Sequence, residues 1–96
     1  MKLKDKCVIV TGGAMGIGLA TVRRLLREGC IVTVWDINND ALESAKKEFQ
    51  NDPVRIFLHK CDITNKNEVN ELIKISKNEM GKIDILINNA GYVQGL

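Results

Sequence analysis

The feature that most constrains the fold of this chain is a regular alternation between two hydrophobic periods. Short apolar runs at 7–10, 31–35, 54–58 and 83–87 are separated by longer segments whose apolar residues recur at helical spacing. Runs of this length that end in turn residues are typical of strands buried on both faces of a sheet. Strands that alternate with helices predict a parallel sheet with right-handed crossovers and helices on both faces.

The helices predicted between these strands have apolar stripes and recognisable ends. The stripes consist of Leu19, Val22, Leu25 and Leu26, then Leu42, Ala45 and Phe49, then Val69, Leu72, Ile73, Ser76 and Met80. Candidate N-caps are Asn38, Asn39 or Asp40 for the second helix and Thr64 or Asn65 for the third. Gly29 and Gly81 are expected to end the first and third helices.

The resulting element order, βαβαβαβ, predicts an α/β fold with a doubly wound parallel sheet and the strand order 3-2-1-4. The fourth strand would then form an open edge, although its residues are strongly apolar. A complete protein normally covers such an edge. We therefore expect the sheet to be a truncated part of a larger one.

Composition excludes several classes of function. A formal charge of +2 and an aromatic content of 4% argue against a nucleic-acid-binding surface. No apolar run approaches the length of a membrane span, and no secretion leader precedes the first strand, so we expect a cytoplasmic protein without a membrane partner.

The cysteines and the histidine are expected to play no part in a metal or catalytic site. The spacing of Cys7, Cys30 and Cys61 does not fit a metal site, so we expect three buried thiols. For His59, the only histidine, we expect neither a metal nor a catalytic role.

A glycine-rich segment, Gly-Gly-Ala-Met-Gly-Ile-Gly at 12–18, lies between the first predicted strand and the first predicted helix. The phosphates of a dinucleotide bind to backbone N–H groups at a helix N-terminus, and they must approach the backbone closely. A side chain at Gly12, Gly16 or Gly18 would block the turn, this approach or the packing of helix on strand. The alternative is a glycine turn that binds nothing, but the strand before it and the helix after it favour a phosphate site.

The spacing of these glycines, preceded by Thr11, is similar to the cofactor motif Thr-Gly-x-x-x-Gly-x-Gly of the short-chain dehydrogenase/reductase family. Further matches follow in the order that the family shows: Asp36 closes the second strand, Cys-Asp-Ile at 61–63 follows the third, and Asn-Asn-Ala-Gly at 88–91 follows the fourth. The resemblance covers the whole chain. It implies that residues 1–96 form a Rossmann-like dinucleotide-binding half-domain and that the catalytic half is absent from them.

The acidic residue at the end of the second strand predicts which dinucleotide is bound. The separation of Asp36 from Gly18 is close to the roughly 20 residues at which an acidic residue meets the adenosine ribose. Its carboxylate can accept hydrogen bonds from both ribose hydroxyls and repels the 2′-phosphate of NADP. Met15 and Ile37 stand where a basic residue would bind that phosphate. We therefore predict NAD as the cofactor, the alternative being that Asp36 only caps a turn.

The family resemblance also implies roles for the later motifs. Asp62 would bind the adenine amino group with the backbone of Ile63 beside it, although Asp62 could equally be a turn residue. Asn89 and the two residues after it would line the nicotinamide-side ribose, whereas Asn88 and Asp84 are expected to be structural. The predicted cofactor-binding residues are Gly12, Met15, Gly16, Ile17, Gly18, Asp36, Ile37, Asp62, Ile63, Asn89, Ala90 and Gly91.

The residues that transfer protons in the family are not found in this sequence. Family enzymes use a Tyr-x-x-x-Lys pair and an upstream serine. The only tyrosine is Tyr92, and Leu96 stands where the lysine would be. Ser44 and Ser76 fall within predicted helices. We therefore assign no catalytic residue and expect the 96-residue chain alone to be inactive.

The expected function is that of the NAD(H)-binding part of an oxidoreductase that interconverts a secondary alcohol and a ketone by hydride transfer. The alternatives are a module that holds a dinucleotide without reacting, and a fragment whose open sheet edge pairs with a partner chain. Family members are usually dimers or tetramers, so the resemblance implies a homo-oligomer. The run 34–38 resembles members that act on hydroxysteroids, retinoids and prostaglandins, but many others share this first half, so the substrate stays open.

Overall fold

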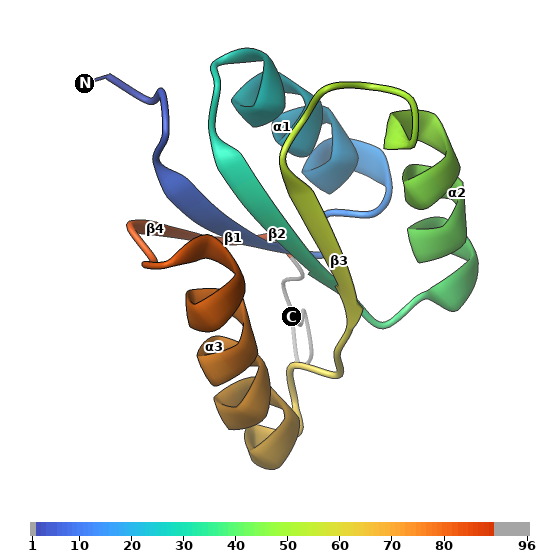
Figure 1. Ribbon diagram of the computed structural model, residues 1–96. Coiled ribbons are helices and arrows are strands. Elements are labelled where there is room, and N and C mark those ends of the chain that lie inside the picture. Colours follow the sequence, from blue (N-terminus) through green and yellow to red (C-terminus); the bar gives the residue numbers. More distant parts are fainter. Residues whose placement is uncertain (1, 90–96) are drawn as a thin grey trace.

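The computed structural model describes residues 2–89, which form a four-stranded parallel sheet in the order β3-β2-β1-β4. The elements are β1 (Cys7–Thr11), α1 (Gly16–Arg27), β2 (Ile31–Asp36), α2 (Asn39–Phe49), β3 (Ile56–Lys60), α3 (Lys66–Met80) and β4 (Ile85–Asn88). Helices α1 and α2 cover one face of the sheet and α3 lies against the other (Figure 1). This confirms the predicted α/β architecture and strand order.

The two faces of the central strands carry separate hydrophobic cores. Every residue of β1 is buried, and so is every residue of β2 after Ile31. Because side chains alternate along a strand, successive residues enter different cores. The core under α1 and α2 includes Val8, Val10, Val32 and Val34, and the core under α3 includes Cys7, Ile9, Trp35 and Leu72. The continuous apolar runs of the sequence therefore correspond to strands covered on both sides.

The third strand begins two residues later than predicted, at Ile56 rather than at residue 54. The ladder with β2 runs from Ile56, opposite Val32, to Lys60, opposite Asp36. Before it, Val54 packs against the core without joining the ladder. Hydrophobicity marks which residues are buried, but strand pairing depends on the backbone, so the predicted boundary was wrong.

The fourth strand also starts later than predicted, at Ile85 rather than at residue 83. Asp84 explains the shift. Its backbone N–H donates to the carbonyl of Cys7 over 2.8 Å, and its carboxylate Oδ2 accepts the N–H of Cys7, also over 2.8 Å. A side chain thus takes the place of a backbone acceptor at the start of the β1–β4 pair, which confirms the structural role expected for Asp84.

The helix ends largely follow the predicted caps. The side chain of Asn38 accepts the N–H of Ala41 at the start of α2, and Asn65 caps α3 in the same way. Gly81 ends α3 with a left-handed φ of 90°, and Gly29 follows α1 with a φ of 87°.

One residue of the predicted stripes does not reach a core. Ile73 of α3 is 42% exposed, and Leu86 of β4 is 61% exposed on the same face of the sheet. Ile73 was expected in the core because its helical spacing fits the stripe. It stays exposed because no described element covers α3 and β4 at this point.

Within residues 2–89, no helix is long and apolar enough to cross a lipid bilayer.

Candidate functional site

The predicted motifs meet at one end of the sheet. Because the strands are parallel, the carboxyl ends of all of them lie at the same edge, which is where open α/β sheets bind ligands. The glycine-rich loop follows β1, Asp36 closes β2, Asp62 follows β3 and Asn89 follows β4. Residues that are far apart in the sequence are therefore brought together by the topology alone.

The loop between β1 and α1 turns sharply and then packs closely. Gly12 and Gly16 have left-handed φ angles of 65° and 59°. A Cβ atom at Gly16 would meet no atom within 4 Å, so the space beside it is open. A Cβ atom at Gly18 would overlap the carbonyl oxygen of Gly12 and lie 2.6 Å from Nδ2 of Asn89. The glycines thus supply an open approach at one position and a close helix contact at another.

The N-terminus of α1 differs from those of the other described helices. Its N-cap residue, Met15, makes no side-chain hydrogen bond to the first turn, which contains no acidic residue. Helix α2, by contrast, is capped by Asn38 and has Asp40 in its first turn. Helix α3 is capped by Asn65 and has Glu68. The first backbone N–H groups of α1 and the positive end of its dipole are therefore left for an anion from outside the chain.

The carboxylate of Asp36 lies beside this loop and is already engaged by the backbone. Asp36 is only 7% exposed. Its Oδ2 atom accepts the N–H of Ala14 over 3.1 Å, and its Oδ1 atom accepts the N–H of Asn38 over 3.0 Å. Each carboxylate oxygen has a second lone pair, so both can still accept a bond from a ligand hydroxyl. Sequence reasoning missed Ala14 and Asn38, because nothing in their residue types indicates these backbone contacts.

A pocket of about 420 Å³ lies at the ends of β2 and β3. It is lined by Trp35, Asp36, Ile37, Cys61, Asp62, Ile63 and Thr64. The structure thus brings together the predicted residues Asp36, Ile37, Asp62 and Ile63. Trp35, Cys61 and Thr64 were not among the predicted site residues, although each adjoins one of them in the sequence and could have been found by that adjacency.

Asp62 forms a turn with Thr64. A turn residue was the alternative to the cofactor-binding role that the family resemblance implies for Asp62. Its Oδ1 atom accepts the backbone N–H of Thr64 over 2.9 Å and the hydroxyl of Thr64 over 2.6 Å. These hydrogen bonds from Thr64 hold the pKa of the Asp62 carboxyl below its usual value. The ionised form is an acceptor only, so it can receive a further hydrogen bond from an amino group.

The turn after β4 is tied to the glycine-rich loop by hydrogen bonds. The hydroxyl of Thr11 donates to Oδ1 of Asn88 over 2.8 Å and accepts the backbone N–H of Asn89 over 3.1 Å. The Nδ2 atom of Asn89 donates to the carbonyl of Gly12 over 3.2 Å. Asn88 and Asn89 therefore fix the end of β4 against the loop. The predicted site residues Ala90 and Gly91, and Tyr92 beyond them, lie outside the described residues.

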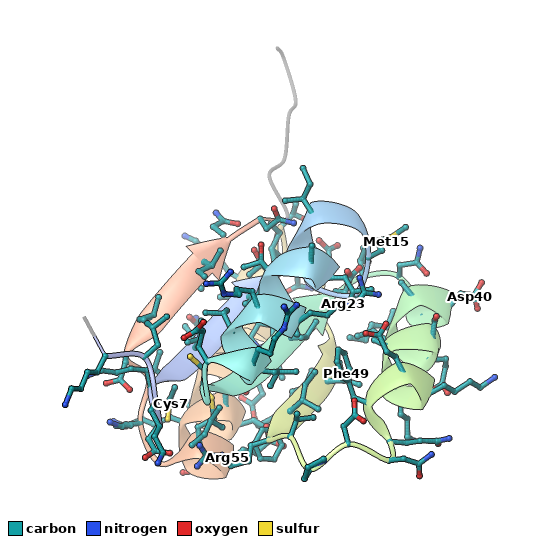
Figure 2. The ribbon with its side chains drawn as sticks, turned by 90° about the horizontal axis from the view of Figure 1, so that it is seen from above. Cys7, Met15, Arg23, Asp40, Phe49 and Arg55 are labelled. Carbon is teal, nitrogen blue, oxygen red and sulfur yellow. The ribbon has the colours of Figure 1, made fainter. Side chains whose placement is uncertain are left out.

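Exposed apolar side chains surround the loop. Met15, Ile17 and Ile37 are 53%, 79% and 59% exposed. Figure 2 shows Met15 in the turn before α1, on the side that faces the start of α2. The Nδ2 atom of Asn38 lies 3.8 Å from Sδ of Met15. Clustered exposed apolar groups mark ligand or partner sites, which agrees with the predicted place of these residues beside a cofactor.

The remaining candidate groups lie apart from the glycine-rich loop. Cys7, Cys30 and Cys61 are free and buried as predicted, and burial raises the pKa of each thiol. Nε2 of His59 lies 2.7 Å from Oε1 of Glu79, which joins β3 to α3. Between residues 2 and 89, no cluster of three or more His, Cys, Asp or Glu side chains could hold a metal ion.

A second, larger hollow of about 710 Å³ runs along α2 and the outer edge of β3. None of the predicted cofactor-binding residues lines it. Size alone therefore does not identify the site, whereas the smaller pocket is lined by Asp36, whose carboxylate contacts the glycine-rich loop at Ala14.

Comparisons with known proteins agree with this geometry. The family profile described as short chain dehydrogenase matches residues 6–95. The chain is similar to 7alpha-hydroxysteroid dehydrogenase of Escherichia coli (strain K12), with 38% identity over 91 residues that cover 95% of this chain and 36% of that protein. It is also similar to 3-oxoacyl-(acyl-carrier-protein) reductase of Thermotoga maritima, with 34% identity covering 98% of this chain and 38% of that protein.

Solved structures show the same arrangement. A crystal structure of hydroxysteroid dehydrogenase from Escherichia coli superposes with a TM-score of 0.85 and 39% identity, over 94% of this chain and 38% of that one. A short chain dehydrogenase from Bacillus anthracis gives a TM-score of 0.84 with 35% identity, over 95% of this chain and 37% of that one. The chain thus spans a little over a third of the length of these relatives.

Proposed function

This chain belongs to the short-chain dehydrogenase/reductase family, and on that basis we propose that residues 1–96 are the NAD(H)-binding part of an oxidoreductase. The reaction proposed for the whole protein is the interconversion of a secondary alcohol and a ketone. The bound nicotinamide would accept or supply the hydride. Members of the family bind nicotinamide dinucleotides, and the choice of NAD rather than NADP is part of this proposal.

The observation that carries the proposal is the uncapped N-terminus of α1 beside the open space at Gly16. A dinucleotide diphosphate would accept hydrogen bonds from backbone N–H groups there. A side chain in this space, or a side-chain cap on α1, would argue against a bound dinucleotide. Among the described residues, no side chain fills the space and none caps α1. We assign this part of the site to Gly12, Met15, Gly16, Ile17 and Gly18.

The preference for NAD rests on Asp36. Its carboxylate lies 3.1 Å from the backbone nitrogen of Ala14 in the loop, so a ribose beside the diphosphate would come within its reach. The negative charge favours two free ribose hydroxyls and opposes a 2′-phosphate. Met15 and Ile37 provide no positive charge beside it to offset that repulsion.

The adenine is proposed to occupy the 420 Å³ pocket between the ends of β2 and β3. Ile37 and Ile63 line it with apolar surface that can stack against a base. The Asp62 carboxylate, whose pKa Thr64 holds below its usual value, is ionised near neutral pH and would accept a hydrogen bond from the adenine amino group. Asn89, Ala90 and Gly91 are proposed to line the nicotinamide side.

The proposed substrate class follows from the relatives. One relative, a hydroxysteroid dehydrogenase, is named for a hydroxyl group, and another, a 3-oxoacyl reductase, is named for a keto group. Hydride transfer interconverts these two groups. We assign no residue of this chain to proton transfer, and we expect the residues that carry it out to lie outside 1–96. The proposal includes a cytoplasmic location and, as the family resemblance implies, a homo-oligomer.

The proposed function is tested by energy transfer from Trp35, the only tryptophan, which lines the adenine pocket. Titration with NADH should quench tryptophan emission and sensitise nicotinamide emission in a saturable way. NADPH should require a much higher concentration to give the same signal. Equal affinity for the two dinucleotides would contradict the assignment to NAD, and binding of neither by the intact protein would contradict the proposal as a whole.

A further inference from the structure

Asn38 joins three parts of the candidate site, although the sequence indicates only a helix cap. Its side-chain Oδ1 accepts the N–H of Ala41 over 2.9 Å and so caps α2. Its backbone N–H donates to Oδ1 of Asp36 over 3.0 Å. Its side-chain Nδ2 lies 3.8 Å from Sδ of Met15, in the glycine-rich loop. Asn38 therefore contacts the first turn of α2, the carboxylate of Asp36 and the glycine-rich loop at Met15.

These contacts depend on each other. The cap bond to Ala41, together with the bond from the N–H of Leu42 to the carbonyl of Asn38, holds Asn38 at φ −88° and ψ 105°. The orientation of the Asn38 N–H follows from this backbone conformation. That N–H then fixes Oδ1 of Asp36, while the N–H of Ala14 fixes Oδ2. The Asp36 carboxylate is thus held in one orientation from two sides.

A fixed carboxylate binds a ribose more strongly than a mobile one, because less rotamer freedom is lost on binding. It also keeps its negative charge at the place where the 2′-phosphate of NADPH would have to lie. A carboxylate that can rotate away loses some attraction for the ribose hydroxyls and some repulsion of the phosphate. Its orientation therefore affects the discrimination between the two dinucleotides as well as the affinity for NADH.

We propose that Asn38 is a positioning residue, which fixes the Asp36 carboxylate and thereby sets the preference for NADH over NADPH. This inference rests on the proposed function, because it presupposes that a dinucleotide binds beside Asp36. Asn38 does not itself need to touch the ribose. It acts through Asp36 and through the loop that contains Met15.

The test substitutes Asn38 in ways that separate helix capping from positioning. Glycine is tolerated at an N-cap at a cost of only a few tenths of a kcal/mol relative to asparagine, so Asn38→Gly should leave the urea unfolding midpoint almost unchanged. It removes the side chain that holds this backbone segment and the contact with Met15. Asn38→Ser restores a side-chain cap. Asn65→Gly is the matched control, because Asn65 caps α3 in the same manner and does not contact Asp36.

Dissociation constants for NADH and NADPH are measured on the intact protein by nicotinamide fluorescence. In Asn38→Gly the backbone N–H that bonds Asp36 is retained but is no longer held by the side-chain cap, so the ratio of the NADPH constant to the NADH constant should fall by about fivefold, as for the weakening of roughly one hydrogen bond. Asn38→Ser should recover most of the ratio, and Asn65→Gly should leave it unchanged. In an Asp36→Ser background, Asn38→Gly should have no further effect on the ratio.

The outcomes distinguish this inference from the proposed function. If the unsubstituted protein prefers NADH and Asn38→Gly keeps the same ratio, the positioning role is wrong while the NAD assignment stands. A loss of affinity for both dinucleotides by one common factor would also contradict it, since that is the result of a merely structural role. If the unsubstituted protein binds neither dinucleotide, both the inference and the proposed function are wrong.

Discussion

The carboxylate of Asp36 accepts a hydrogen bond of 3.1 Å from the backbone N–H of Ala14, and so joins the end of β2 to the glycine-rich loop. This contact is buried, and it means that the residue proposed to choose the cofactor also shapes the loop that would bind the diphosphate. Affinity and stability should therefore change together when Asp36 is altered.

Replacing Asp36 with serine should weaken NADH binding about tenfold or more, because hydrogen bonds to a charged group contribute roughly 1.5–3 kcal/mol. Affinity for NADPH relative to NADH should rise, since the charge that repels the 2′-phosphate is gone. The buried N–H of Ala14 loses its acceptor as well, which should lower the free energy of unfolding by about 1–3 kcal/mol. Fluorescence titration and urea denaturation measure the two effects. An unchanged preference for NADH would show that another residue discriminates.

Two glycines of the loop should respond differently to alanine. In Gly18→Ala the new Cβ would overlap the carbonyl oxygen of Gly12 and press on Asn89, so α1 must move away from the loop. We expect a loss of about 3 kcal/mol in unfolding free energy, the upper part of the usual range for overpacking. Urea denaturation of the intact protein measures it.

Gly16→Ala is the matched comparison. Its Cβ would enter open space, and the only local cost is the left-handed φ of 59°, about 1–2 kcal/mol. Because that space is where the diphosphate is proposed to lie, this variant should lose most of its dinucleotide affinity despite the smaller loss of stability. Full binding by Gly16→Ala would place the diphosphate elsewhere.

The fold was predictable because its signals are local and repeated. Gly81 and Asn65 mark helix ends by residue type, and the strand order follows from the connections. The starts of β3 and β4 were not predictable, because they depend on which backbone groups pair across strands. At Asp84 a side chain replaces a backbone acceptor, and no pattern of hydrophobicity shows this.

The site was predictable as a set of motifs but not as a set of contacts. Gly16, Asp36 and Asp62 were found by spacing and resemblance. The contacts from Ala14 and Asn38 to Asp36 use backbone N–H groups, which every residue except proline carries, so residue identity gives no sign of them. Asp62 shows a further limit, because the turn with Thr64 and the proposed adenine contact need the same residue type.

The buried hydrogen bond from Nε1 of Trp35 to Oγ of Ser76 should be important for stability. Trp35 is 3% exposed and Ser76 is fully buried, so removing the hydroxyl leaves the indole N–H without an acceptor. Ser76→Ala should lower the unfolding free energy by about 1–3 kcal/mol. In a Trp35→Phe background the same substitution should cost far less, because no N–H is left unpaired. Equal costs in the two backgrounds would mean that this bond contributes nothing.

The pH dependence of stability should include a contribution from Asp84. The hydrogen bond from the backbone N–H of Cys7 holds the pKa of Asp84 below its usual value of 3.8, and Lys82 lowers it further. A carboxyl whose pKa is lower in the folded state than in the unfolded state stabilises the fold above the unfolded pKa. That stabilisation should therefore be complete at pH 7 and should be lost as the pH falls below about 4.

The substitution Asp84→Asn isolates this effect, because the amide oxygen can still accept the N–H of Cys7 but carries no charge. The variant should be less stable than the unsubstituted protein from pH 7 to pH 5, and the difference in urea midpoint should shrink as the solution is acidified below about pH 4. Asp52→Asn serves as the control, since the Asp52 carboxylate lies in an exposed turn and makes no hydrogen bond or ion pair with the described residues. A difference for Asp84→Asn that persists unchanged at the lowest pH would show that the loss comes from altered packing rather than from the charge.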